Sequence, residues 1–355
     1  MLQQIRKKID AIDEKLVKLL NDRMRLSEEV GNVKRSTGQS VFAPGREEML
    51  LQRLEELNDG SMSTVELRAI YSEVISISRS RQKELRFAYL GPEGSYCHQA
   101  AVKRFGNFDR FAACGNIQEI FDAVASEEVD AGIVPIENST EGGVNATHDA
   151  LIHTDLKICG EIFLPIRHVL CAANKDNKIN VIYSHPQAFG QCRKWLGRHH
   201  SSVKLVEMAS TSLGAKRAKE EKHAAAISSE LSVELYGLDI IQKNIQDSTK
   251  NLTRFLIIGH QNSSQTKRDK TSLLFSVRHE IGSLSKVLGI FSKEKLNLEK
   301  IESRPSKDRE WEYLFFVDIK GHCEDPLIAK ALEKVSRKTH WLKILGSYPM
   351  VNKHV

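Results

Sequence analysis

Long apolar runs are absent from this sequence. No stretch approaches the ~20 consecutive apolar residues that a helix needs to cross a bilayer. The opening residues, MLQQIRKKIDAIDEK, are charged from the sixth position onward and lack the apolar core of a secretory signal. We therefore expect a cytoplasmic protein without a membrane segment.

Cysteines are few, and their spacing is irregular. None of the six lies in a CxxC pair or in the spacing typical of a zinc site. They are Cys97, Cys114, Cys159, Cys171, Cys192 and Cys323. We expect them to be reduced thiols, as in most cytoplasmic proteins, and we expect no structural metal ion.

The sequence also lacks a concentrated block of positive charge. Its 52 Lys and Arg residues against 46 Asp and Glu give a net charge of +6, but no basic run is interleaved with aromatic residues. This pattern disfavours a nucleic acid as partner and leaves a small anionic ligand open. The length of 355 residues exceeds one ordinary hydrophobic core, so we expect about two to four domains.

Residues 1–85 have the apolar periodicity of helices. The chain is free of proline as far as Pro44, and its apolar residues recur mostly in steps of three and four. They are Leu2, Ile5, Ile9, Ile12, Leu16, Leu19, Val30 and Val33. The pattern predicts one long amphipathic helix, followed by helices over 46–57 and 64–85. Because so thin a helical hairpin cannot cover its own apolar stripe, we expect a homodimer or a larger homo-oligomer.

Residues 86–262 change to short apolar runs, each followed by a polar loop and most by a helical segment. The runs are FAYLG, AGIVPI, NVIYS, VKLVEMAS, AAAIS, DIIQKNIQ and TRFLIIG. This alternation predicts an α/β region with a mostly parallel sheet that is covered on both faces. At least seven strands favour two lobes around a cleft. The polar clusters GPEGS, ENSTEGG and SHPQ follow their strands, which is where ligands bind in such sheets.

Residues 271–350 follow the polar, basic spacer HQNSSQTKRDK. The predicted order is strand, helix, two strands, helix and strand, which is an α+β arrangement of the ferredoxin-like type. No element in this region carries a nucleophile next to a base. We therefore expect a regulatory or assembly role for it.

Two cations on the first helix share a face. Arg23 and Lys34 are eleven residues apart, which at ~100° per residue returns them to one side of the helix, ~16 Å apart along its axis. Two such side chains could hold a small dicarboxylate between them. Arg6 lies ~25 Å from Arg23 along the rod, so it could reach the same ligand only from a second protomer. The spacing alone does not separate this interpretation from ordinary solvated helix charges.

The segments IRKKIDAIDEKLVKLL, RMRLSEEVGNVK and REEMLLQRLEEL, together with Ser78 and Gln82, resemble the all-helical chorismate mutases. Those enzymes rearrange chorismate to prephenate without covalent catalysis. The resemblance implies that Lys34 and Gln82 are catalytic donors to the ether oxygen, on which negative charge builds in the transition state. The substrate-binding set that it implies is Arg6 (from the partner chain), Arg23, Arg46, Glu47 and Ser78. Ala43 stands where the family often has Asp, a departure that leaves the cationic groups in place.

Four ordered motifs, GPEGSYCHQA, PIENSTEGGV, SHPQAFGQC and NIQDSTKNLTRF, resemble prephenate dehydratase over residues 86–262. GSLS at 282–285 and IESRP at 301–305 resemble the ACT-type regulatory domain that follows such dehydratases. The whole chain therefore resembles the bifunctional chorismate mutase–prephenate dehydratase family of phenylalanine biosynthesis. The implied domains are a helical mutase domain at 1–85, a two-lobed dehydratase domain at 86–262 and an ACT-type domain at 271–350.

Prephenate loses CO2 and water together to give aromatic phenylpyruvate, and aromatisation drives the reaction. The enzyme needs only to orient the ring carboxylate and to protonate or hydrogen-bond the departing hydroxyl, so we expect no cofactor and no metal ion. By the resemblance, Thr253 acts at that hydroxyl, and Glu137 and His185 are the titratable candidates for the acid. Arg254 should point away from Thr253 on an ideal strand, so substrate binding and a structural role both stay open for it.

The resemblance implies two further sets of binding residues. The set around prephenate is Ser95, Glu137, Asn138, Ser139, Gly143, His185, Gln187 and Arg254. The set around phenylalanine, as an effector that lowers dehydratase activity, is Gly282, Ser283, Leu284, Glu302, Ser303, Arg304 and Pro305. Ser95, Cys97, Ile281 and Ser283 depart from the residues that the family usually has at these positions.

Three alternatives compete with this interpretation. A mutase fused to a prephenate dehydrogenase would need a GxGxxG nucleotide loop after a strand, and the nearest segment, LGPEGS, lacks that pattern. A two-lobed solute-binding protein with a regulatory tail would share the lobed sheet, but the mutase-like helix and the missing signal peptide argue against it. Arogenate in place of prephenate is an alternative that the sequence leaves open.

Overall fold

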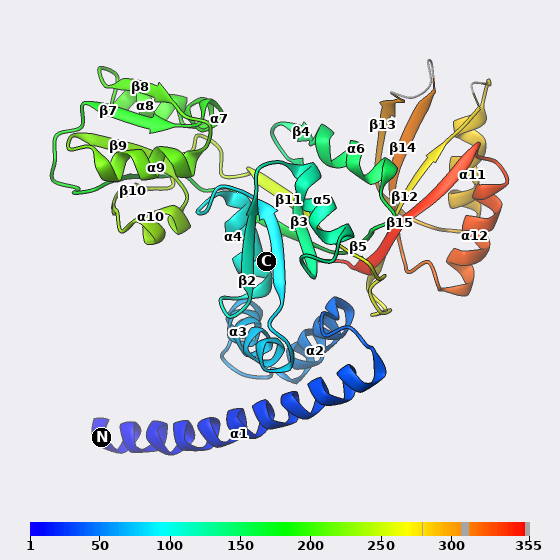
Figure 1. The fold of residues 1–355 in the computed structure, drawn as a ribbon, viewed down its shortest axis with the longest axis horizontal. Helices are drawn as coiled ribbons and strands as arrows, with labels where there is room; N and C mark the ends of the chain where they lie inside the picture. The colour runs from blue at the N-terminus through cyan, green and yellow to red at the C-terminus, as the bar shows by residue number, and fades with distance from the viewer. Residues whose placement is uncertain (279, 307–311, 352–355) are drawn as a thin grey trace.

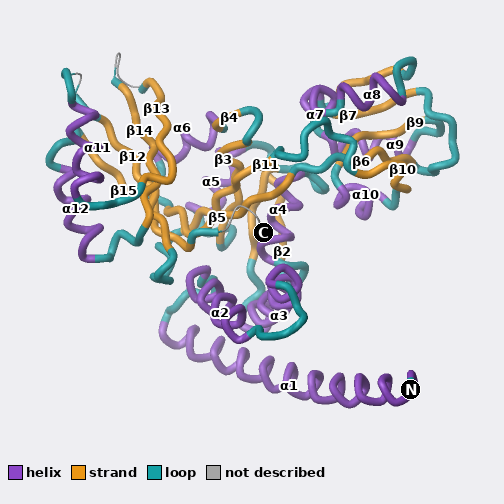
Figure 2. The backbone as a smooth tube through the Cα atoms, turned by 180° about the vertical axis from the view of Figure 1, so that it is seen from behind, coloured by secondary structure: helices purple, strands orange, loops and turns teal. Residues whose placement is uncertain are grey.

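The structure is a computed structural model that describes residues 1–278, 280–306 and 312–351. A first lobe of mixed α/β structure occupies the centre of the molecule (Figure 1). The helical region lies against one end of this lobe, and a second lobe and the C-terminal sheet lie on its opposite sides, as the reverse view also shows (Figure 2). The first lobe is therefore the part that contacts every other part.

The helical region contains the three predicted helices, α1 (Leu2–Thr37), α2 (Pro44–Leu57) and α3 (Thr64–Gln82). The long helix α1 ends where Gly38 takes a left-handed φ of 68°, a conformation that glycine adopts without a steric penalty. A capping box between Ser63 and Glu66 begins α3. The third helix stops at Gln82, earlier than the predicted residue 85, because the chain extends there into the first strand of the central lobe.

The first lobe is built on a sheet with the strand order β2-β1-β3-β11-β5, and β4 pairs with β3. Its strands are β1 (Arg86–Leu90), β2 (Arg110–Cys114), β3 (Ala131–Asn138), β4 (Gly142–Gly143), β5 (Lys157–Pro165) and β11 (Leu252–Gly259). Its helices are α4 (Tyr96–Phe105), α5 (Ile117–Ala125) and α6 (Asn145–His153). Two apolar clusters cover the two faces of the sheet, one of them shared with the C-terminal region.

The second lobe has a sheet with the order β10-β6-β9-β7-β8. Its strands are β6 (Val169–Ala172), β7 (Val181–Ser184), β8 (Lys204–Glu207), β9 (Ala224–Ser228) and β10 (Asp239–Lys243). Its helices are α7 (Pro186–Gln191), α8 (Arg193–His199), α9 (Thr211–Glu220) and α10 (Glu230–Tyr236). The chain enters this lobe after β5 and returns to the first lobe through β11, so the two lobes share two crossing segments.

The prediction of a mostly parallel sheet is wrong for both lobes. Only the β1–β2, β1–β3, β7–β8 and β7–β9 pairs of the described strands are parallel, whereas β11 runs antiparallel to both of its neighbours. The reason is the crossing between lobes. β5, β6, β10 and β11 are joined by direct passages rather than by crossover helices, and antiparallel pairing needs no such helix.

The C-terminal region has the predicted ferredoxin-like order of β12 (Asp269–Ser276), α11 (Ser283–Lys293), β13 (Leu298–Pro305), β14 (Tyr313–Lys320), α12 (Pro326–Ser336) and β15 (Trp341–Pro349). The sheet order is β13-β14-β12-β15, and α11 and α12 cover one face (Figure 1). The other face packs on the first lobe. Gly346 lies so close there that a Cβ atom on it would meet the Ile158 carbonyl oxygen at 2.1 Å.

Candidate active sites

Three of the predicted mutase residues, Arg23, Ser78 and Gln82, lie where α1 crosses α3. Lys34 follows on α1 three residues after Gly31, which contacts Gln82. We call this set of four residues the helical pocket. The Arg23 guanidinium donates to the Ser78 hydroxyl, and the Gln82 amide donates to the Ser78 carbonyl oxygen at 3.1 Å. The Lys34 Nζ donates to the Val41 carbonyl oxygen at 3.3 Å. Sequence positions as far apart as 23 and 78 therefore meet at one site.

A glycine on α1 permits this close crossing. Every residue of α1 lies in the described part of the chain, and of these Gly31 alone is buried. A Cβ atom at Gly31 would lie 2.8 Å from the Gln82 Cα atom, so any larger residue would push the two helices apart. Gln82 Oε1 is buried and has no hydrogen-bond partner among the described residues, so it can accept from a ligand. The Gln82 Nε2 uses only one of its two protons on the Ser78 carbonyl oxygen, so the other proton can be donated.

Burial also disfavours the charged forms of two cations in the helical pocket. It lowers the pKa of Arg23 and of Lys34 below their ordinary values, although Glu47 acts in the opposite direction on Lys34. A bound dianion would remove this imbalance, because an opposite charge nearby favours the protonated form of a lysine or arginine.

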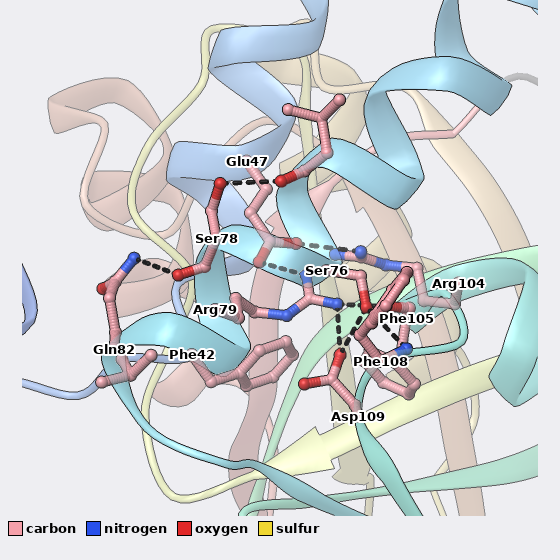
Figure 3. A network of polar contacts seen from close by, with 12 residues as sticks. Phe42, Glu47, Ser76, Ser78, Arg79, Gln82, Arg104, Phe105, Phe108 and Asp109 are labelled. Carbon is pink, nitrogen blue, oxygen red and sulfur yellow. Dashed lines mark hydrogen bonds and ion pairs between the residues drawn. The ribbon is translucent and has the colours of Figure 1, made fainter. Parts of the chain in front are cut away.

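The other predicted mutase residues have different surroundings. Arg6 and Arg46 are exposed to solvent, and Arg6 lies toward the far end of α1. Glu47 is buried, and its two carboxylate oxygens accept hydrogen bonds from Arg79 at 2.7 Å and from Arg104 at 3.0 Å (Figure 3). Neither of these arginines was predicted from the sequence. Arg79 lies on α3 and Arg104 on α4 of the first lobe, and only the fold brings them to Glu47 on α2.

A cavity of about 370 Å³ lies between the first and second lobes, and we call it the interlobe cavity. Six predicted dehydratase residues line it: Ser95, Asn138, Gly143, His185, Gln187 and Thr253. They come from the ends of strands in both lobes and from the loops that follow them. The Ser95 hydroxyl caps α4 by accepting from the His98 N–H. Tyr96 and Cys97, the first two residues of this helix, also line the cavity.

The Thr253 hydroxyl is oriented by Asn138, which is its register partner on β3. The Asn138 Nδ2 donates to the Thr253 Oγ1 at 2.8 Å. The Asn138 Oδ1 accepts from the backbone N–H groups of Thr140 and Glu141, so the orientation of the amide is fixed. Because Thr253 Oγ1 accepts this bond, its own proton is free to be donated to a ligand.

Hydrogen bonds continue from Asn138 away from Thr253. Asn138 donates to Asn251, which donates to Gln191 Oε1 at 2.9 Å. His168 Nε2 also donates to this oxygen, at 2.8 Å, and His168 Nδ1 lies 2.7 Å from the Tyr96 hydroxyl. Burial lowers the pKa of His168, against a smaller effect of Gln191, so its imidazole is neutral at neutral pH.

Sequence analysis missed these four residues as members of the site. Tyr96, Gln191 and Asn251 lie inside the motifs GPEGSYCHQA, SHPQAFGQC and NIQDSTKNLTRF, so the motifs held a signal that could have identified them. His168 lies between motifs, in LPIRHVL, and nothing in its local sequence marks it.

Three predicted dehydratase residues lie outside the interlobe cavity. Side chains alternate along a strand, so Glu137 points away from the side of Asn138, and Arg254 points away from the side of Thr253. Glu137 pairs with Lys300 of the C-terminal region at 2.8 Å. Arg254 is buried between Glu161 at 2.8 Å and Asp318 at 2.7 Å. Ser139 uses its hydroxyl on the backbone of Lys250 and Leu252.

Comparison with known proteins identifies the three parts of the chain. Residues 5–83 match the family Chorismate mutase type II, residues 87–263 match Prephenate dehydratase, and residues 271–337 match the ACT domain. A bifunctional chorismate mutase/prephenate dehydratase from Aquifex aeolicus is 42% identical over 353 residues, which are 98% of each chain. Another from Pseudomonas aeruginosa is 41% identical over 355 residues.

This chain belongs to the bifunctional chorismate mutase/prephenate dehydratase family. It is thus an enzyme with two activities, an isomerase and a lyase, and it carries an ACT domain. Among solved structures, a prephenate dehydratase from Arthrobacter aurescens in complex with L-Phe has a TM-score of 0.70 and 32% identity, covering 76% of this chain and 91% of that one.

In the ACT domain, the residues predicted for the effector fall into two groups. Gly282, Ser283 and Leu284 line a hollow of about 210 Å³ beside Tyr313 and Phe315. The 302–305 segment lies on β13, where exposed and half-buried residues alternate. Its exposed members are Ser303 and Pro305, and its half-buried members are Glu302 and Arg304.

Glu302 and Arg304 contact the first lobe instead of the hollow. The Glu302 carboxylate lies 2.9 Å from the Lys300 Nζ, and a Cβ atom at Gly143 would come within 2.6 Å of its oxygen. Arg304 donates to the Asn145 carbonyl oxygen at 3.2 Å. Within one chain, the two groups of predicted effector residues are therefore not brought together.

Other classes of site find no support in the described residues. Within these residues, no group of three or more His, Cys, Asp and Glu side chains is arranged to hold a metal ion. None of the described helices is both long enough and apolar enough to cross a membrane.

Proposed function

We propose that the helical pocket is the chorismate mutase site and that the interlobe cavity is the prephenate dehydratase site. The observation that carries this proposal is the convergence, at two separate places, of side chains suited to each reaction. Cations and neutral donors meet at the helical pocket, and an oriented hydroxyl lies in the interlobe cavity. The two sites belong to domains that we place at 1–85 and 86–262, before an ACT domain at 271–350.

The mutase reaction requires binding and electrostatic stabilisation alone. Arg23 binds a substrate carboxylate, and the Lys34 ammonium and the Gln82 amide donate to the ether oxygen as charge builds on it. Groups that are fixed before the reaction stabilise this charge without reorganisation, and the removal of one such donor typically slows a reaction by about 10²–10³-fold. Arg6 completes the pocket from the partner of a homodimer, and Arg46, Glu47 and Ser78 are its remaining members.

The dehydratase reaction consumes one proton. The prephenate dianion plus one proton gives the phenylpyruvate anion, CO2 and water, so the departing hydroxide must be neutralised. Thr253 donates a hydrogen bond to this hydroxyl, because its oxygen already accepts from Asn138. His185 accepts the Gln187 N–H through Nδ1 at 3.2 Å, which leaves Nε2 to carry a proton and to act as a second donor. As the C–O bond breaks, solvent supplies the proton that completes the water molecule.

The carboxylates of prephenate are held by the remaining polar groups of the interlobe cavity. Ser95 begins α4, and the partial positive charge at a helix start attracts anions. Gln187 and the glycine loop at Gly143 line the same cavity. We leave Glu137, Ser139 and Arg254 out of this binding, because they line a different hollow that the first lobe shares with the ACT domain.

We propose phenylalanine as an effector of the dehydratase activity. The related structure from Arthrobacter aurescens was solved in complex with L-Phe, and this chain has an ACT domain with a hollow lined by Gly282, Ser283 and Leu284. The exposed Ser303 and Pro305 would meet such a ligand across an interface between two chains. The contact of Glu302 with Gly143 gives the effector strand a direct connection to the interlobe cavity. A cytoplasmic location fits these biosynthetic activities.

The test is an assay of the purified protein with chorismate, prephenate and arogenate side by side, with no added cofactor. Phenylpyruvate is detected by its ultraviolet absorbance in alkali. We expect it to form from both chorismate and prephenate, and phenylalanine to lower its rate of formation. Prephenate that accumulates without phenylpyruvate would contradict the dehydratase assignment, and a rate that is higher with arogenate would reassign the substrate. Titration calorimetry that shows no phenylalanine binding at near-millimolar concentration would contradict the effector assignment.

A further inference from the structure

The helical pocket and the dehydratase domain are joined by a buried network of charges (Figure 3). Arg79 on α3 donates to Glu47 at 2.7 Å and to Asp109 at 2.7 Å, and it also donates to the Phe105 carbonyl oxygen. The side chain of Arg79 is 4% exposed, and that of Asp109 is fully buried. Such a network is expensive to break, because removal of one member leaves an unpaired charge in the interior.

The network crosses the boundary between two catalytic domains. Glu47 and Arg79 belong to the mutase helices α2 and α3, whereas Arg104 belongs to α4, which begins at the interlobe cavity. Arg104 donates to the second oxygen of Glu47 at 3.0 Å. The boundary is also packed, since Phe42 contacts the ring of Phe105 edge to face. Arg104 is therefore held at a fixed position relative to the mutase helices.

These two arginines determine the charge of Glu47. Burial alone would raise the pKa of this carboxyl group, but the attraction of Arg79 and Arg104 and their hydrogen bonds outweigh burial and hold the pKa below its ordinary value. Each carboxylate oxygen has one guanidinium donor, so the plane of the carboxylate is also fixed.

Glu47 is also connected to the catalytic donors of the helical pocket. Its charge acts on Lys34, where it opposes the effect of burial. Its partner Arg79 directly follows Ser78 in α3, and the Ser78 hydroxyl accepts from Arg23. A shift of Glu47 would therefore change the field at the ammonium group that serves the ether oxygen.

We propose that Arg104, a residue of the dehydratase domain, is a positioning residue for the mutase reaction. Together with Arg79 it fixes the orientation of the Glu47 carboxylate, which belongs to the proposed mutase site, and keeps it ionised. The proposal rests on the assignment of the helical pocket as the mutase site. It means that the mutase site of this chain is complete only when the helices are seated on the first lobe.

The test uses the full-length chain with Arg104→Met, and Lys103→Met as the matched control on the same helix. We expect Arg104→Met to lower mutase kcat/KM by at least about tenfold, while dehydratase kcat/KM measured from prephenate stays within about twofold of the wild type. The loss of a cation should also raise the pKa of Glu47, so the acidic limb of the mutase pH profile should move to higher pH. Lys103→Met should change neither quantity.

A second variant covers the case in which Arg104→Met does not fold. Arg104→Gln keeps a hydrogen-bond donor but removes the charge, and we expect a smaller loss of rate with the same upward shift of the acidic limb. An unchanged mutase pH profile in a variant that retains dehydratase activity would overturn the proposal. Lys34→Ala, assayed in parallel, distinguishes a failure of the Arg104 proposal from a failure of the mutase-site assignment. If Lys34→Ala also leaves the mutase intact, the helical pocket itself is wrongly assigned.

Discussion

At the scale of single residues, two neighbours on β11 have opposite roles. Thr253 lies in the interlobe cavity and receives a hydrogen bond from Asn138. Arg254 lies on the other face of the sheet among Glu161, Asp318 and Tyr348. One strand therefore presents a hydroxyl to the interlobe cavity and a cation to the ACT domain.

Substitution of His168 should lower both the stability of the chain and its dehydratase activity. His168→Leu removes one hydrogen bond from Gln191 and one from Tyr96, although each keeps another partner. Two hydrogen bonds of ordinary strength contribute about 1–3 kcal/mol, so we expect the free energy of unfolding to fall by about that amount. We expect dehydratase kcat to fall as well, because Gln191 also holds Asn251 beside Asn138. Mutase activity should be unchanged. Equal dehydratase activity in the variant and the wild type would contradict a role for this hydrogen-bond chain.

The lowered pKa of His168 also predicts how the stability of the chain changes with pH. Because burial lowers the pKa of His168 in the folded chain, the unfolded chain takes up a proton first as the pH falls below the ordinary value of about 6.5. The stability of the wild type should therefore decrease from pH 7 toward pH 5, and the decrease should be shallower in His168→Leu. Burial also lowers the pKa values of His98, His148 and His200, which contribute to the same slope. Denaturant titrations at several pH values measure it.

The alternation of side chains along a strand predicts part of this arrangement from the sequence. It predicts that Thr253 and Arg254 face opposite sides, and the same rule, applied to Asn138, separates it from Glu137. Glu137 was nevertheless a candidate acid, because its carboxyl group suited the chemistry and the sequence did not say which face meets the substrate. The partners of His168 and the contact of Arg104 with Glu47 depend on distances between elements, which no local pattern contains.

At the scale of elements, β11 clamps the first lobe to the ACT domain. It lies between β3 and β5 in the first lobe, and its Arg254 pairs with Asp318 on β14. Burial would lower the pKa of Arg254, but Tyr348, Asp318 and Glu161 raise it well above the ordinary value, so the residue stays charged. Lys270 on β12 adds a second cation beside Glu161 at 2.9 Å.

Arg254→Met should destabilise the whole chain. It leaves Glu161 and Asp318 buried with one cation fewer, and the loss of one partner of a buried ion pair costs about 3–5 kcal/mol. The matched control is Arg110→Met, which breaks the exposed pair with Glu84 and should change the free energy of unfolding by less than about 1 kcal/mol. Urea titration of both variants measures the difference, and equal effects would contradict the clamp.

The strand β13 should transmit the effector signal through Lys300. This residue bridges Glu302, in the effector strand, and Glu137, which precedes Asn138 on β3. We expect Lys300→Met to bind phenylalanine in calorimetry but to lose at least about half of the inhibition of the dehydratase. Lys334→Met is the matched control, because it breaks a Lys–Glu pair between the two ACT helices far from this bridge. Full inhibition in Lys300→Met would exclude this route.

The sequence predicted the type of most elements and misjudged how they pair. The alternation of apolar runs and helices favoured a parallel sheet, but β5, β6, β10 and β11 carry the chain between lobes and pair antiparallel. The strands β2, β4, β5 and β6 were not predicted. β2 is half-exposed and only partly apolar, and β4 has two residues, so neither gives a clear periodicity.

At the scale of the whole molecule, the apolar stripe of α1 stays uncovered in a single chain. The large apolar side chains along it, from Ile5 to Val33, are between 41% and 64% exposed. A contiguous apolar face of this length on a helix is typical of an interface between protein chains. The same dimer would supply Arg6 to the helical pocket of the partner chain.

A charge placed in this stripe should separate the two chains of the dimer and lower mutase activity. For Ile9→Glu we expect a smaller assembly mass in sedimentation equilibrium. We expect a fall in mutase kcat/KM of at least about tenfold, equal to about 1.4 kcal/mol, because Arg6 no longer reaches its pocket. Lys7→Glu is the control, since two residues rotate the helix by about 200° and place Lys7 on the opposite side. An unchanged mass and full mutase activity in Ile9→Glu would contradict the dimer.

The central claim is that one chain holds two separate active sites, and paired assays of Thr253→Val and Lys34→Ala test it most directly. Each variant is assayed with chorismate for the mutase and with prephenate for the dehydratase. Thr253→Val should lose at least about 100-fold of dehydratase kcat and keep its mutase rate, because Val removes the donated hydrogen bond at nearly the same volume. Lys34→Ala should show the reverse loss, by about 100-fold or more. Two variants that keep both activities, or lose both together, would contradict the account.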